Sequence, residues 1–195
     1  MKKFKEYCKN LNLPNLEKDF RSVKIKPNDS YQATYPFFVE HFKGIKLLTE
    51  QDVVIGIHLV YGWMPTIFDF RSSELQSAVK ILNRVKSGES VSVEDLMVLK
   101  ACFNNSIIGT SKLLHFINPK VYGIWDSKVY RYITKKKPYS AAVNNCQSYF
   151  NYNIRCLEIT NDVAYLKLHN SVEAKIGYKI SKLRSVELIM FLSKK

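Results

Sequence analysis

A lysine and an aspartate fourteen positions apart are the residues of this sequence whose types and spacing could do chemistry. They are Lys112 and Asp126, in the segment NNSIIGTSKLLHFINPKVYGIWDSKVYRYIT at 104–134. Asp126 is expected to begin a helix, where amide donors and the helix dipole keep a carboxylate ionised. Lys112 is predicted in the first turn of the preceding helix, where the dipole disfavours its charged form. A partly neutral lysine is suited to act as an amine nucleophile.

Both residues also have a simpler interpretation. Asp126 precedes Val129, Tyr130 and Ile133, whose spacing places them on one helix face, so a carboxylate there is a good N-cap whatever else it does. Lys112 could be an exposed, solvated lysine. The two interpretations of Asp126 are compatible, because a capping geometry holds the carboxylate both fixed and charged.

A turn is predicted at IIGTS, residues 107–111, between two helical patterns. It contains Ile108 and Gly109, followed by the hydroxyls of Thr110 and Ser111. Exposed backbone amides in such a turn, and at the helix start that follows, can bind a DNA phosphate without reading the base sequence. The glycine alone is a weak signal, because many turns between helices contain one.

The charge of the chain favours a polyanionic partner. Thirty Lys and Arg residues against seventeen Asp and Glu residues give a net charge of +13 on 195 residues. Such a field attracts nucleic acid by counterion release, or acidic lipid by simple attraction. A proteome rich in lysine would also produce basic chains, but an excess this large on a small protein makes nucleic acid the first choice.

Several other classes of protein are disfavoured. No apolar run follows the basic start MKKF, and the longest apolar runs are too short to cross a bilayer. We therefore expect a cytoplasmic, nucleoid-associated monomer that needs no membrane. No cofactor and no zinc site are expected, because the histidines lack metal-ligand spacing. The cysteines have no C-x-x-C spacing and are expected to be reduced core thiols, at Cys8, Cys102, Cys146 and Cys156.

Helical periodicity dominates the chain, which predicts a single all-α, compact multi-helix domain over 1–195. Residues 1–30 are expected to form a basic N-terminal arm with a short helix. Caps at Thr49 and Ser92 and a stop at Gly88 support the boundaries of the following helices. The predicted helices cover 35–48, with Gly44 as an alternative end, 49–66, with its end at Pro65, and then 72–88, 93–104, 111–119, 126–134, 140–159 and 171–195.

The segment 104–134 resembles the helix-hairpin-helix DNA glycosylases, the superfamily of endonuclease III and 8-oxoguanine glycosylase, of which this chain would be a compact member. WDSKVYRYI, residues 125–133, is similar to the part of those enzymes that carries an aspartate at a helix start. IGTSK, residues 108–112, is similar to the end of their hairpin and the lysine after it. The resemblance implies a helix-hairpin-helix motif, an essential carboxylate at Asp126 and a nucleophile at Lys112.

The implied activity is excision of a damaged or modified base from duplex DNA. The target nucleotide is flipped into a pocket, and the glycosidic bond breaks through an oxocarbenium-like sugar that a carboxylate can stabilise. If Lys112 attacks the sugar, a Schiff base forms and strand cleavage by an abasic-site lyase step can follow. The expected substrate is an oxidised purine, or a bulky modified cytosine of phage DNA removed in anti-phage defence.

Other residues are candidates for binding DNA. The backbone of Ile108, Gly109, Thr110 and Ser111 and the side chains of Lys128, Lys135 and Lys136 are expected to contact phosphates. The base pocket is expected to contain aromatic rings and a histidine, each of which could equally be core, and the candidates are Tyr61, Trp63, His115 and Phe116.

Two other functions stay open from the sequence. The first is a non-enzymatic nucleic-acid-binding module built on the same hairpin, which would bind DNA in a salt-sensitive way and release no base. The second is a helical adaptor whose basic face meets an acidic protein or a membrane surface, which would not bind DNA at ordinary salt.

Overall fold

The computed structural model describes residues 8–26, 29–69 and 72–193, and the regular elements in these ranges are helices without strands. The all-α prediction is therefore confirmed. Backbone contacts divide the chain into two compact units. The central unit comprises residues 28–122, and the terminal unit combines residues 1–27 with residues 123–195. Whether the two units act as the one domain expected from the sequence stays a prediction.

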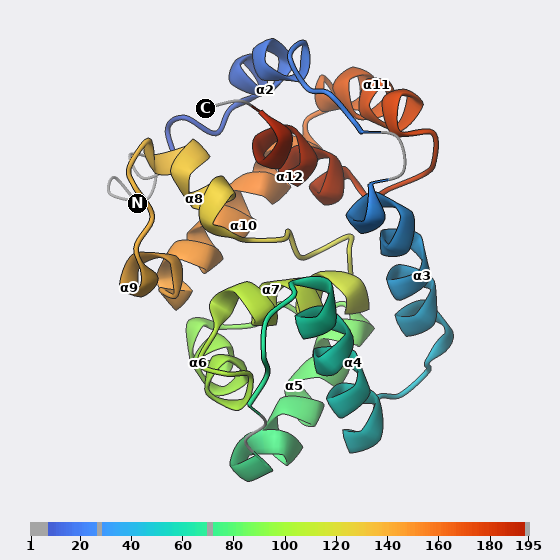
Figure 1. Ribbon diagram of the computed structural model, residues 1–195, viewed down its shortest axis with the longest axis vertical. Coiled ribbons are helices and arrows are strands. Elements are labelled where there is room, and N and C mark those ends of the chain that lie inside the picture. The colour runs from blue at the N-terminus through green and yellow to red at the C-terminus, as the bar shows by residue number, and fades with distance from the viewer. Residues whose placement is uncertain (1–7, 27–28, 70–71, 194–195) are drawn as a thin grey trace. The chain divides into compact units, whose positions relative to one another are not determined.

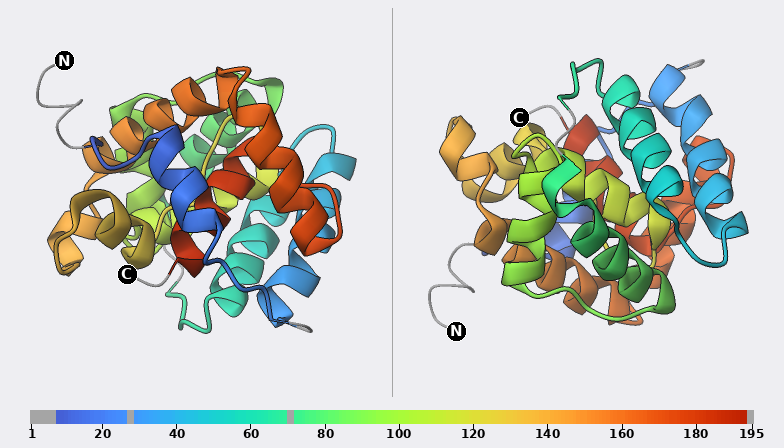
Figure 2. Two further views of the ribbon diagram at one scale, coloured as in Figure 1. Left: turned by 90° about the horizontal axis from the view of Figure 1, so that it is seen from above. Right: turned by 90° about the horizontal axis from the view of Figure 1, so that it is seen from below.

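The central unit is built around a helix, α7, that is buried almost along its whole length. The helix packs against α3, α4, α5 and α6 at once, and for this reason every residue of α7 except Ile108 is buried. Seen from below, α7 lies among α4, α5 and α6 (Figure 2). The elements of the unit are α3 (Ser30–Gly44), α4 (Glu50–Trp63), the 3₁₀ helix η1 (Ser72–Glu74), α5 (Leu75–Ser87), α6 (Val93–Cys102) and α7 (Ile107–Ile117).

Local sequence signals set several boundaries in the central unit. Thr49 and Asp52 form a capping box at the start of α4, and Ser92 and Asp95 form another at the start of α6. Gly88, with a φ of 98°, ends α5 in the left-handed region that favours glycine. These three predicted boundaries are confirmed.

The terminal unit is organised around its last helix, α12, which packs against α2, α8, α10 and α11. Segments from the two ends of the chain thus lie together in one unit, as Figure 1 shows for α2 and α12. The helices are α2 (Leu13–Phe20), α8 (Ser127–Thr134), α9 (Ser140–Val143), α10 (Cys146–Asn161), α11 (Tyr165–Ile176) and α12 (Lys182–Leu192). The short helix predicted within residues 1–30 is α2, and residues 1–7 and 27–28 lie outside the described residues.

Two predicted helices of the terminal unit are wrong, because each is two helices. The pattern at 171–195 is broken where Gly177, with a φ of 86°, ends α11 and the Ser181 side chain caps α12. The pattern at 140–159 is broken after α9, where the Asn145 side chain accepts a hydrogen bond from the Ser148 amide and starts α10. In both places an apolar spacing continues across a turn, so periodicity alone joins the helices.

All four cysteines are buried free thiols, at Cys8, Cys102, Cys146 and Cys156. Burial raises the pKa of the Cys8 thiol to about 12 and that of Cys102 to about 11. Such thiols stay protonated at neutral pH and are poor nucleophiles.

Neither a membrane-spanning helix nor a metal centre is found in the described part of the chain. None of its helices is long and apolar enough to cross a bilayer. No group of three or more histidine, cysteine, aspartate or glutamate side chains in the same residues could hold a metal ion.

Candidate functional site

Asp126 is the N-cap of α8, as the sequence predicts. Its backbone is extended, and its Oδ1 accepts a hydrogen bond of 2.8 Å from the Val129 amide. The side chain is half-buried. The N-cap position therefore fixes the carboxylate beside the first amides of α8.

The backbone that leads into Asp126 is held by two side chains of α10. The Asn153 Oδ1 accepts a hydrogen bond of 2.7 Å from the Gly123 amide, and the Tyr152 hydroxyl donates one of 2.9 Å to the Ile124 carbonyl. Both bonds are buried. A Cβ on Gly123 would lie 3.1 Å from the Tyr152 hydroxyl, so the absence of a side chain permits this close approach. We call this arrangement of Gly123, Ile124, Tyr152 and Asn153 the backbone clamp.

Trp125, directly before Asp126, strengthens this part of the structure. Its ring is fully buried, and its Nε1–H donates a hydrogen bond of 2.8 Å to the Val143 carbonyl of α9. The ring also contacts Tyr152, with a distance of 5.1 Å between ring centroids. Trp125 is therefore a core residue of the terminal unit. Every residue from Gly123 to Trp125 is thus fixed by a contact to another element of the unit.

Helix α8 itself is anchored to the N-terminal part of the terminal unit. The Tyr132 hydroxyl donates a hydrogen bond of 2.7 Å to the Asp19 carboxylate of α2, and the Asn10 side-chain amide donates one of 2.7 Å to the Ile133 carbonyl. Burial, together with the nearby Asp19 charge, raises the pKa of Tyr132, so its hydroxyl remains a donor at physiological pH. The helix that carries Asp126 is therefore restrained at both ends.

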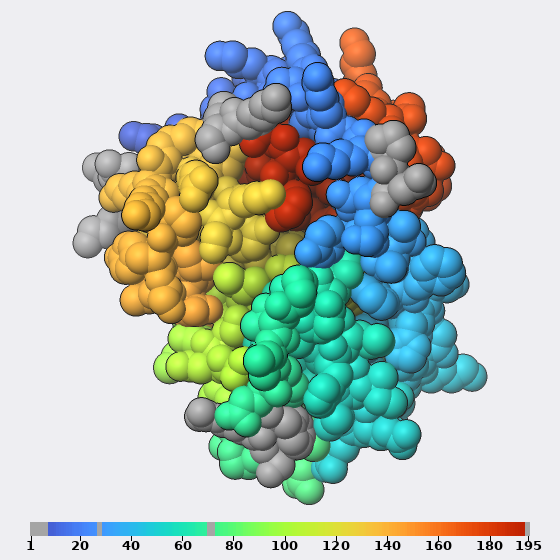
Figure 3. Space-filling view, in the orientation of Figure 1, coloured from blue at the N-terminus to red at the C-terminus, as the bar shows by residue number. Residues whose placement is uncertain are grey.

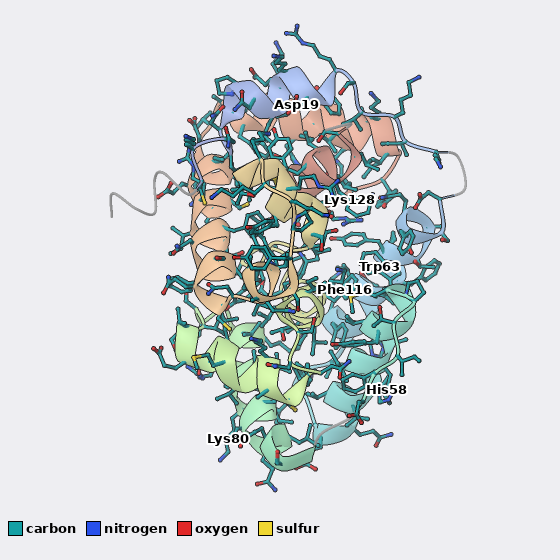
Figure 4. All side chains as sticks on the ribbon, turned by 60° about the vertical axis from the view of Figure 1, so that its left-hand side comes forward. Asp19, His58, Trp63, Lys80, Phe116 and Lys128 are labelled. Atoms are coloured by element: carbon teal, nitrogen blue, oxygen red, sulfur yellow. The ribbon has the colours of Figure 1, made fainter. Side chains whose placement is uncertain are left out.

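The three lysines predicted to contact phosphates are exposed and lie at the two ends of α8. Lys128 extends over the Phe191 ring, with its Nζ 3.9 Å from the ring centroid, and Figure 4 shows its place on α8. Lys135 ends the helix with a φ of 58°, and its Nζ lies 4.3 Å from the Tyr132 ring centroid. Lys136 follows it directly. Their ammonium groups can reach an anionic partner without desolvation of a buried charge.

The turn predicted at 107–111 is wrong, because those residues form the first part of α7. The turn between α6 and α7 lies earlier and contains Asn104 and Asn105, with φ values of 58° and 51°. Asparagine tolerates this left-handed region better than most residues. Ser106 then caps α7 by accepting a hydrogen bond of 3.2 Å from the Gly109 amide. We call residues 103–106 the α6–α7 turn.

The residues predicted as a phosphate-binding turn have structural roles instead. A Cβ on Gly109 would lie 2.8 Å from the Tyr61 ring, so Gly109 lets α4 and α7 approach closely. Thr110 and Ser111 are fully buried, and their hydroxyls donate to the carbonyls of Ser106 and Ile108 within the helix. In this structure an anion could reach the α6–α7 turn, with its exposed Asn105, but not these buried side chains.

Lys112 is placed differently from the prediction. It is the sixth of the eleven residues of α7, beyond the first turn, and is 8% exposed. The argument from the helix dipole therefore fails, because the dipole acts within the first turn. Lys112 belongs to the central unit and Asp126 to the terminal unit.

Of the four predicted base-pocket residues, Trp63 is partly exposed and the others are buried. His115 Nδ1 lies 2.6 Å from the Tyr122 carbonyl, which can only accept, so Nδ1 donates; His115 Nε2 lies 2.8 Å from the Tyr35 hydroxyl. His115 is thus a core histidine with both ring nitrogens bonded. Phe116 supports Trp63 from below, with ring centroids 5.3 Å apart (Figure 4).

Tyr61 faces away from this cluster of rings. Its hydroxyl donates a hydrogen bond of 3.0 Å to the Phe103 carbonyl at the start of the α6–α7 turn. Burial raises the pKa of Tyr61, which keeps this hydroxyl a donor. Tyr61 therefore supports the α6–α7 turn from inside the unit and is not positioned as a wall of an open pocket.

Sequence reasoning missed the backbone clamp. Its partners lie 28 and 30 residues apart in the chain, and a tyrosine and an asparagine in a helical pattern carry no local sign of such bonds. The Asn-Asn pair of the α6–α7 turn did carry a signal, because asparagine is favoured where φ is positive. No protein-family model matches this chain, and neither the curated proteins nor the solved structures include a significant match to it.

Proposed function

We propose that this protein is a DNA glycosylase in which Asp126 is the essential carboxylate. The observation that carries the proposal is the fixed carboxylate itself: a half-buried aspartate at a helix start, preceded by a segment whose backbone is held by buried hydrogen bonds at Gly123 and Ile124. Catalysis by electrostatic stabilisation needs a charge that is already in place and does not reorganise during the reaction. The net charge of +13 supports DNA as the partner.

The proposed reaction breaks the bond between C1′ of the sugar and the nitrogen of the base. The electron pair of that bond leaves with the base, and positive charge develops on C1′ and the ring oxygen. The Asp126 carboxylate stabilises this charge, and water then attacks C1′ and loses a proton, which leaves an abasic site. The base must first leave the stack, at a cost of a few kcal/mol.

Lys112 would act as the nucleophile only in the bifunctional form of the reaction. Its neutral amine would attack C1′ in place of water as the base leaves, and would lose a proton. The C1′–O4′ bond would then break, with O4′ taking up a proton, to give a Schiff base that borohydride can reduce and trap. Because Lys112 is 8% exposed, we take hydrolysis by water as the main reaction. A covalent adduct with wild type that is absent from Lys112→Ala would establish the lyase form.

Backbone and lysine contacts are proposed to hold the DNA without reading its sequence. The α6–α7 turn would offer backbone amides to one phosphate, in the manner of a helix-hairpin-helix motif. Lys128, Lys135 and Lys136 would contact other phosphates near Asp126. Binding should therefore weaken steeply as the salt concentration rises.

The proposed substrate is an oxidised purine or a bulky modified cytosine of phage DNA. Duplexes containing each base would be incubated with the protein and then treated with alkali, which breaks the strand at abasic sites. Excision from modified phage DNA, but not from oxidised DNA, would indicate a role in defence; the opposite result would indicate repair. Salt-sensitive binding without release of any base would instead support a non-enzymatic nucleic-acid-binding module.

A further inference from the structure

The central unit contains a groove between α3 and α4, to which the proposed reaction assigns no role. Both helices pack against α7, and they run in opposite directions along its surface (Figure 1). Between the first part of α3 and residues 54–63 of α4 they leave a groove of about 750 Å³. Figure 3 shows both helices at the molecular surface. A volume of this size lies within the range of small-molecule sites.

Aromatic rings form one end of the groove. Trp63 lies 5.6 Å from Tyr31 and 6.3 Å from Phe38, measured between ring centroids and with the rings edge to face in both pairs. Phe116 of α7 lies beneath Trp63 and Phe38, at 5.3 Å from each ring. Tyr31 is 40% exposed although it belongs to this cluster. The groove therefore offers a rigid aromatic wall on which a flat ring could stack.

The polar groups of the groove are uncharged or weakly basic. No lysine, arginine, aspartate or glutamate lines it among the described residues; besides the polar atoms of Tyr31 and Trp63, the polar side chains are Ser30, Thr34 and His58. His58 Nδ1 lies 2.7 Å from the Val54 carbonyl and must donate to it, so the Nε2 of the neutral ring is an acceptor. The Thr34 hydroxyl donates to the Ser30 carbonyl, which leaves its oxygen able to accept.

These features suit one part of a nucleic acid. A phosphate would not be held where no cation lines the groove, whereas a nucleobase is flat, aromatic, uncharged and carries N–H donors at its edge. We propose that the groove between α3 and α4 binds an unpaired nucleobase of a DNA strand, which stacks on one of the Trp63 and Tyr31 rings and meets the other edge to face, because the two ring planes are 72° apart. This inference rests on the proposed function only in taking DNA as the partner, and does not require base release.

Gly62 gives a way to close the groove without disturbing the fold. It lines the groove near the end of α4, and a Cβ built on it meets nothing within 4 Å. Gly62→Leu therefore places a side chain in the groove and also removes a helix-weakening glycine. Gly44, the last residue of α3, has the same open surroundings, so Gly44→Leu is the matched control.

The test compares two single-stranded oligonucleotides of equal length, one with bases and one made only of abasic sugar-phosphate units. Wild type and Gly44→Leu should bind the base-bearing strand about tenfold more tightly at the same salt concentration, as expected for stacking of one base. Trp63 fluorescence should change with that strand alone. Gly62→Leu should bring the ratio of affinities close to one, with a thermal midpoint no lower than that of wild type.

Two results would overturn the inference. Equal affinity of wild type for the two strands, with unchanged tryptophan fluorescence, would show that the groove takes another occupant, such as an amphipathic helix of a partner protein. A preference for bases that survives in Gly62→Leu would place base binding elsewhere. Base release is measured separately. A preference for bases without base release would contradict the proposed glycosylase activity but support base binding in the groove. Base release without a preference for bases would contradict base binding in the groove alone.

Discussion

Removing the Tyr152 hydroxyl should lower the stability of the fold and the rate of base release. Tyr152→Phe deletes the donor to the Ile124 carbonyl, a buried bond of 2.9 Å, together with the hydrogen bond between the hydroxyl and the Cys156 thiol, and keeps the ring itself. Burial raises the pKa of Tyr152 well above its ordinary value, so the hydroxyl is a donor at any assay pH. An unsatisfied buried carbonyl costs about 1–3 kcal/mol. For a chain of this size each kcal/mol lowers the thermal midpoint by about 2–4 °C.

The effect on the reaction follows from the place of Ile124, two residues before Asp126. A carboxylate displaced by a fraction of an ångström stabilises the transition state less well, so we expect base release to slow about 10- to 100-fold at saturating DNA. Single-turnover kinetics with an excess of protein measure this step without the contribution of DNA binding.

A second tyrosine supplies the control for lost stability. The buried Tyr122 hydroxyl donates a bond of 2.8 Å to the Glu89 carbonyl in the central unit. Tyr122→Phe should destabilise the protein at least as much as Tyr152→Phe, with base release unchanged below the thermal midpoint. Equal rates for Tyr152→Phe and wild type, or equal slowing in both variants, would refute the role assigned to the backbone clamp.

Three further predictions concern other parts of the molecule. Gly109→Ala should lower the free energy of unfolding by about 1–3 kcal/mol, measured by urea denaturation, because its methyl group would lie 2.8 Å from the Tyr61 ring; a stability equal to wild type would contradict the close approach. Burial lowers the pKa of His169, so the folded state binds a proton less readily than the unfolded state. Stability should therefore fall as the pH falls through 6.5, the ordinary pKa of histidine, and below. Thermal melts should show a smaller loss of stability in His169→Asn than in wild type over this pH range. Identical pH profiles of the two proteins would exclude His169 as the cause. Lys136→Ala should reduce the slope of log affinity for DNA against log salt concentration by about 0.9, the value expected for the loss of one phosphate contact. Lys80→Ala, on the exposed face of α5, should leave this slope unchanged. A larger change in Lys80→Ala than in Lys136→Ala would show that DNA binds elsewhere.

The helical class and many helix starts could be predicted because their causes are local. Thr49 and Ser92 precede acidic residues at the spacing of a capping box, and Gly88 supplies the positive φ that ends α5. The cap at Asp126 is local in the same sense. Such signals depend on a few neighbouring residues and can be read without knowledge of the tertiary structure.

The errors arise where a local pattern has two meanings. Gly109 suggests a turn in the sequence, but in the structure it is a contact point between helices, with Tyr61 packed against it. The difference depends on a residue 48 positions away, which no local pattern contains. The error for Lys112 has the same origin. Because α7 begins at Ile107 and not after a turn at 107–111, Lys112 lies in the middle of the helix and not in its first turn.

The environment of Asp126 was predictable only in part for the same reason. A helix cap can be read from the sequence, but the backbone clamp depends on α10 packing against the segment before α8, with partners 28 and 30 residues away. Met97 shows the same limit: it is an apolar residue directly after the buried Leu96 of α6, yet it is 60% exposed. Periodicity identifies a helix more reliably than it identifies the face that other helices cover.

The most direct measurement compares Asp126→Asn with Asp29→Asn. Asparagine caps helices as well as aspartate, so both variants should keep their caps, at α8 and α3 respectively, and differ from wild type only in charge. Asp126→Asn should release base about 100- to 1,000-fold more slowly, with similar thermal stability and DNA affinity, and Asp29→Asn should match wild type. Release by Asp126→Asn at the wild-type rate, or no release by wild type from any modified duplex, would contradict the assignment of Asp126 as the essential carboxylate.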